Sequence, residues 1–60
     1  MKLSDAIELQ TLLAADSNYT NPTIWNHGFG CTVETTRKTD GAIITAKVSD
    51  GNLIVEVSNQ

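Results

Sequence analysis

The sequence predicts a single small α+β domain, residues 1–60, in which an N-terminal amphipathic helix packs on a three-stranded antiparallel β-meander (αβββ). Three observations predict this class. Sixty residues are enough for one domain and one small core. Apolar residues recur at helical spacing in the first quarter of the chain, and alternate with polar residues in the second half.

Residues 4–15 have the features of a helix. Ser4 or Asp5 is expected to cap the first turn, and Glu8, three residues after Asp5, fits a capping box. Leu12 falls outside the main apolar stripe, so it lies either at the edge of the core or on a surface that contacts another molecule. The stripe itself contains Leu3, Ala6, Ile7, Leu9, Leu13 and Ala14.

Residues 16–23 are rich in turn formers, and Pro22 disfavours helical backbone at Asn21. We therefore expect the helix to end here and an irregular connection to follow. Tyr19 and Trp25 are expected to cover one end of the core with their rings.

Three strands are predicted over residues 29–36, 42–49 and 52–58. Asp50-Gly51 is a preferred type I′ hairpin turn, and it pairs Val48 with Leu53. A three-residue loop before the second strand would mix the two faces, whereas a four-residue loop, 38–41, pairs Val33 with Ala46 and keeps them separate. The face predicted to lie under the helix contains Cys31, Val33, Ile44, Ala46, Val48, Leu53, Val55 and Val57, and Phe29 has the same parity.

Composition excludes several classes of site. Four basic and seven acidic residues give a formal charge of −3, and the basic residues are scattered, so direct nucleic-acid binding is disfavoured and a basic protein is favoured as partner. One cysteine and one histidine cannot form an internal disulfide or a structural zinc site, so no cofactor or metal is predicted. The N-terminal segment does not read as a signal peptide or a membrane span, and we expect a cytoplasmic protein with no membrane partner.

Catalysis is not predicted. His27 and Cys31 would be about 13 Å apart on one strand, and they could meet only if residues 26–28 form a turn. Gly28 and Gly30 flank an aromatic residue, but the pattern lacks the third glycine of a dinucleotide-binding loop. Glu34 and Glu56 would flank Thr45 on an open sheet face without a pocket, which fits a salt-bridged polar surface better than a catalytic pair. An enzyme would have to use one of these groups.

The leading hypothesis is a small protein-interaction module: an inhibitor, adaptor or regulatory protein that works by surface occlusion. An accessory protein of a mobile element or phage that acts on a host defence protein has this character. The alternative is a structural protein that forms a homodimer through sheet edges or the helix face. The predicted partner-binding surface is the outer face of the sheet, containing Thr32, Glu34, Thr36, Ile43, Thr45, Lys47, Ile54 and Glu56.

Overall fold

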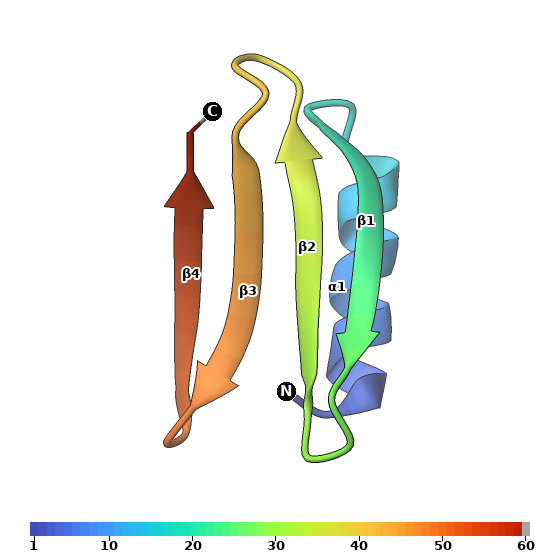
Figure 1. Cartoon of the computed structure of the whole chain (residues 1–60). Coiled ribbons are helices and arrows are strands. Elements are labelled where there is room, and N and C mark those ends of the chain that lie inside the picture. Colours follow the sequence, from blue (N-terminus) through green and yellow to red (C-terminus); the bar gives the residue numbers. More distant parts are fainter. Residues whose placement is uncertain (60) are drawn as a thin grey trace.

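The computed structural model describes residues 1–59. Within them the chain forms α1 (Leu3–Ala15), β1 (Tyr19–Asn26), β2 (Cys31–Arg37), β3 (Ile43–Ser49) and β4 (Asn52–Ser58). The strands make one antiparallel sheet in the order β1-β2-β3-β4, and α1 lies against one face on the β1–β2 side (Figure 1). The α+β class is confirmed, but the sheet has four strands where three were predicted.

The additional strand, β1, includes much of the segment that was predicted to be irregular. It is an edge strand, and its register against β2 shifts between Thr20 and Thr23. Asn21 has a φ of 50° in this bulge, and Pro22 follows it. A bulge on an edge strand tolerates a proline because the missing amide donor interrupts no ladder. The Gln10 side chain then donates a hydrogen bond of 3.0 Å to the Pro22 carbonyl, which ties the bulge to α1.

The helix begins earlier than predicted and without a side-chain cap. Lys2 occupies the N-cap position and makes no capping side-chain bond, so the predicted capping by Ser4 or Asp5 is wrong. The preceding residue explains the shift. The terminal ammonium of Met1 donates to the Cys31 carbonyl at 2.9 Å, and the Cys31 amide donates to the Met1 carbonyl at 2.7 Å. This pairing holds Met1 against β2, so Lys2 is the single residue between Met1 and the helix.

The predicted strand registers are largely confirmed. Val33 lies opposite Ala46 across β2 and β3, and Val48 lies opposite Leu53 across β3 and β4. Asp50 and its following glycine have φ values of 52° and 77°, as a type I′ turn requires. The same register, continued along β2, would pair Cys31 with Val48. That pair does not form, because the β2–β3 ladder ends at Val33 and Met1 binds the main chain of Cys31.

The helix covers only half of the sheet. α1 contacts β1 and β2, and the buried core is a small cluster of Ala6, Cys31 and Val33 with partly buried neighbours. One helix is about 10 Å wide and strands are about 4.8 Å apart, so α1 can cover two strands. The inner surface of β3 and β4, here called the apolar floor, consists of Ile44, Ala46, Val48, Leu53, Val55 and Val57.

The prediction that these floor residues lie under the helix is therefore wrong for much of the floor. Val48, Leu53, Val55 and Val57 have 43%, 65%, 54% and 50% of their surface exposed. Ala46 is buried, and Ile44 is partly buried. The error follows from β1, because the helix lies over the strand that was not predicted.

Candidate protein-binding surfaces

The eight residues of the predicted site do share the outer face of the sheet. Strand pairing aligns Glu34, Thr45 and Glu56 in one row across β2, β3 and β4. The neighbouring rows place Thr36 opposite Ile43 and Lys47 opposite Ile54. Thr32 pairs with β1 on the same face. Most of the eight are half-buried by their neighbours, so the face is a continuous surface of mixed polarity.

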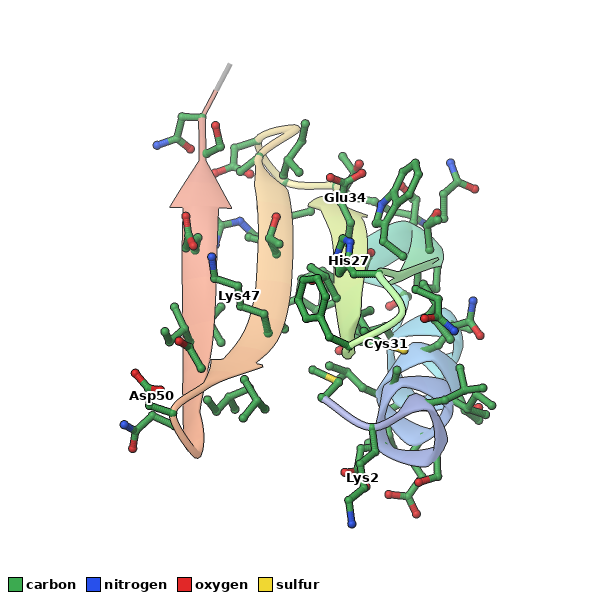
Figure 2. The ribbon with its side chains drawn as sticks, turned by 60° about the horizontal axis from the view of Figure 1, so that its bottom comes forward. Lys2, His27, Cys31, Glu34, Lys47 and Asp50 are labelled. Atoms are coloured by element: carbon green, nitrogen blue, oxygen red, sulfur yellow. The ribbon has the colours of Figure 1, made fainter. Side chains whose placement is uncertain are left out.

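On this face Lys47 and Glu56 form an ion pair, whereas Glu34 is in no ion pair within residues 1–59. The Nζ of Lys47 lies 2.9 Å from Oε1 of Glu56, and both side chains are about half exposed, so the pair contributes little to stability. Among residues 1–59 the other ion pair joins Arg37 and Asp40, so Glu34 has no cationic partner there. Figure 2 shows Glu34 on β2 and Lys47 on β3. A free carboxylate therefore faces solvent from the middle of the sheet.

An aromatic patch at one end of this face was not predicted. Trp25 pairs with Thr32 across β1 and β2, which puts the indole on the outer face, and it is 53% exposed. The Nε2 of His27 lies 3.0 Å from Oγ1 of Thr32. The ring of Phe29 stacks on His27 with 5.7 Å between centroids, and Phe29 is 93% exposed. Trp25, His27 and Phe29, here called the aromatic patch, thus lie at this end of the sheet, with Phe29 in the turn between β1 and β2.

Two expectations about these rings were wrong. Trp25 was expected to cover the core and Phe29 to share the core face, but both are exposed. For Trp25 the cause is its pairing with Thr32 on the outer face. For Phe29 it is a tight hairpin turn, closed by the His27 amide donating to the Gly30 carbonyl at 2.9 Å. Gly28 has a φ of 88°, and its amide donates to the Asn26 side chain. Asn and Gly two residues apart are a turn signal, which could have placed Phe29 at a hairpin tip.

The candidate catalytic residues are not brought together. His27 bonds to Thr32 on the outer face, whereas Cys31 is buried on the inner face beneath α1. Figure 2 shows their separate positions. Glu34 and Glu56 lie two strands apart, about 10 Å, with Thr45 between them. Within residues 1–59 no three His, Cys, Asp or Glu side chains gather in a way that could hold a metal ion.

Two hollows border the sheet away from the eight outer-face residues. One, of about 600 Å³, opens where β2 and β3 separate, and Met1, Phe29 and Val48 contribute to its lining. Lys2 and Asp50 also line this hollow, and they lie on opposite sides of it in Figure 2. The other, of about 170 Å³, lies between α1 and the apolar floor.

Comparison with known protein families, with curated proteins and with solved structures found no match for this chain. The only helix in the described part of the chain, α1, has 13 residues, and it is not long enough to cross a membrane.

Proposed function

We propose that this chain is a small non-catalytic protein-interaction module that binds a protein partner through its outer sheet face and the aromatic patch. The exposure of the patch carries the proposal. The chain has three aromatic residues, and two of them, Trp25 and Phe29, are more than half exposed. A domain of this size gains most stability by burying its rings, so displaying them is costly unless a partner covers them.

The side chains on this surface indicate what kind of partner would bind to it. Tryptophan is among the residues most enriched at binding hot spots, where a ring fills a desolvated pocket. Trp25 and Phe29 therefore suit a partner with apolar pockets. Glu34, without a cationic partner in the described chain, suits a lysine or arginine beside those pockets. The net charge of −3 favours encounter with a basic protein.

Occlusion of a partner's surface needs no catalytic group, so an inhibitor, an adaptor and a regulatory subunit all fit this mode of action. An accessory protein of a mobile element or phage that blocks a host defence protein would work in the same way. The proposed compartment is the cytoplasm, which the single cysteine supports: Cys31 is a free buried thiol.

The experiment is quantitative capture from a lysate of the source cell, with immobilised wild-type chain, Trp25→Ala and Phe29→Ala. A partner held by the patch is retained by the wild type, and its affinity for Trp25→Ala falls at least about 30-fold, the effect of losing a hot-spot side chain. Both rings are exposed, so both variants should keep the wild-type circular dichroism spectrum.

The matched control is Leu12→Ala. Leu12 is 69% exposed and lies on α1, so its truncation removes a large apolar side chain outside the proposed site. Capture should be unchanged in this variant. Equal capture by wild type, Trp25→Ala and Phe29→Ala would contradict the proposal.

A further inference from the structure

We propose that the apolar floor is covered by the same floor of a second copy of this chain, giving a closed two-fold dimer. This inference does not depend on the proposed partner, because the floor and the outer face lie on opposite sides of the sheet. In one subunit α1 packs on β1 and β2, whereas β3 and β4 extend beyond the helix and are not covered by it (Figure 1). The helix and the lower, uncovered floor beside it are here called a step.

The floor has the chemistry of an interior surface. All six of its side chains are aliphatic, and four of them are between 43% and 65% exposed. Lys47 and Glu56 belong to the same strands but point to the other face. Two floors can therefore meet without burying a charge, which is the main cost of apposing identical surfaces.

The side of the helix that borders the floor is apolar over its C-terminal half, and Asp5 lies one turn before Leu9 on the same side. The hollow of about 170 Å³ has Leu9 and Leu13 of α1 on one side and Ile44, Ala46, Leu53 and Val55 on the other. Leu12 lies about 60° further round the helix than Leu9. It thus extends this flank away from the sheet, and it is 69% exposed. Leu9 and Leu12 form a wall beside the floor.

Two such steps fit each other. Stacked sheets lie about 10 Å apart, and a helix is about 10 Å across, so the second sheet would occupy the same layer as α1. With the two-fold axis parallel to the strands, floor meets floor and β4 of each copy lies beside the Leu9–Leu12 wall of the other. The helix of each copy then covers the open β4 edge of its partner. A single foreign helix on the floor would leave that edge exposed.

The area is sufficient for a specific dimer. Each strand of the floor has seven residues, about 23 Å in length, so two strands give roughly 230 Å². The flank of a 13-residue helix, about 20 Å long, adds roughly 200 Å². The β4 edge, about 23 Å long and up to roughly 10 Å deep, adds roughly 200 Å². Each copy therefore offers roughly 600 Å² of flat area, and a total of about 1,200 Å² is the lower end of the range for specific interfaces.

The need for a partner on this face is strong because the buried core is small. The buried apolar residues of the described chain are Ala6, Cys31, Val33, Ala42 and Ala46. Three of the five are alanine. Domains of this size commonly gain stability by association when they lack disulfides or metals. A second copy is the partner that is present wherever the chain is made.

The test is sedimentation equilibrium of the purified full chain over a concentration series. The monomer mass is 6.5 kDa, and the proposal expects a single species of twice that mass at high concentration. Leu53→Arg puts a charge into the floor of both copies and should raise the dimer dissociation constant about 100-fold or more. Leu53 is 65% exposed, so the variant monomer keeps its fold, as circular dichroism will check.

Two further variants separate this arrangement from others. Thr45→Arg is the matched control: it adds the same charge to the outer face, between Glu34 and Glu56, and should leave the dimer intact. Leu12→Arg alters the wall and should weaken the dimer, whereas a dimer made by pairing two β4 edges would not respond. A wild-type monomer at all concentrations, a mass that keeps rising beyond two copies, or a dimer unaffected by Leu53→Arg or Leu12→Arg would overturn the proposal.

The variants also distinguish this dimer from the proposed partner binding. Leu53→Arg should still bind a partner captured by the aromatic patch, as a monomer. Trp25→Ala should still dimerise while losing that partner. Capture of a foreign protein that is abolished by Leu53→Arg and retained by Trp25→Ala, from a chain that stays monomeric, would identify a different occupant of the floor and refute self-association.

Discussion

Truncation of one valine on each half of the inner sheet face tests how far α1 protects the sheet. Val33 is 1% exposed beneath the helix, and Val55 is 54% exposed on the apolar floor. The two residues are both inward-facing, and both pair with Ala46, on its opposite sides. Val33→Ala and Val55→Ala are therefore the same chemical change in the same sheet, and differ in what covers the side chain.

The expected magnitudes differ severalfold. Removing two buried carbon groups costs about 1.6 kcal/mol in lost transfer free energy, and the cavity left beneath α1 raises the cost of Val33→Ala to about 2–3 kcal/mol. Val55 has already about half its surface in water, so Val55→Ala in the monomer costs about 0.8 kcal/mol and leaves no cavity. A chain of this length is expected to have about 3–9 kcal/mol of stability, so the first change removes a large share of it.

Urea unfolding, monitored by circular dichroism, measures the loss of unfolding free energy in Val33→Ala and in Val55→Ala. It should be done at the lowest workable concentration, since a dimer would bury Val55 and raise the cost of its truncation. Equal free-energy losses for the two variants in the monomer would refute the conclusion that the helix covers only β1 and β2.

Two more predictions concern the hairpin turns. The Arg37 guanidinium holds the pKa of Asp40 at about 2, below its usual 3.8, by a side-chain hydrogen bond. A lowered folded-state pKa gives stability that is present above about pH 4 and is lost as the pH falls towards 2. The difference in unfolding free energy between wild type and Asp40→Asn should therefore shrink over that pH window, as urea titrations at successive pH values will measure. Gly51→Ala should cost about 1 kcal/mol in thermal or urea unfolding, because its φ of 77° strains any other residue while its Cβ would meet nothing. Gly30→Ala, where φ is not positive, is the control and should be nearly neutral; an equal loss in both would contradict this reason.

The parts of the fold that could be predicted from the sequence are those controlled by local chemistry. Asp50-Gly51 specifies its own turn type, and the alternation of β3 and β4 then leaves one register that keeps the apolar residues together. The loop at 38–41 follows for the same reason. These features depend on neighbours in the sequence, and a single sequence contains enough information to assign them.

The features that were missed depend on contacts between distant residues. β1 contains a proline and an asparagine with positive φ, which together suggest a loop, and it is a strand because it can pair with β2 across a bulge. Because of this extra strand, the helix lies over β1 and β2, and the apolar floor on β3 and β4 is left uncovered. Of the candidate site, the outer-face residues were predicted by strand parity, whereas Trp25 and Phe29 required knowledge of β1 and its turn.

The two edges of this sheet are unlike each other, and the difference limits how copies can assemble. At β1 the bulge and Pro22 break the row of main-chain groups that another strand would need. β4 is regular over seven residues and contains no proline. Head-to-tail growth of a continuous sheet requires two competent edges on every copy, one to receive and one to extend. A chain with one competent edge cannot extend a sheet in both directions, and in the proposed dimer the helix of the partner covers that edge, so no edge is left from which a fibre could grow.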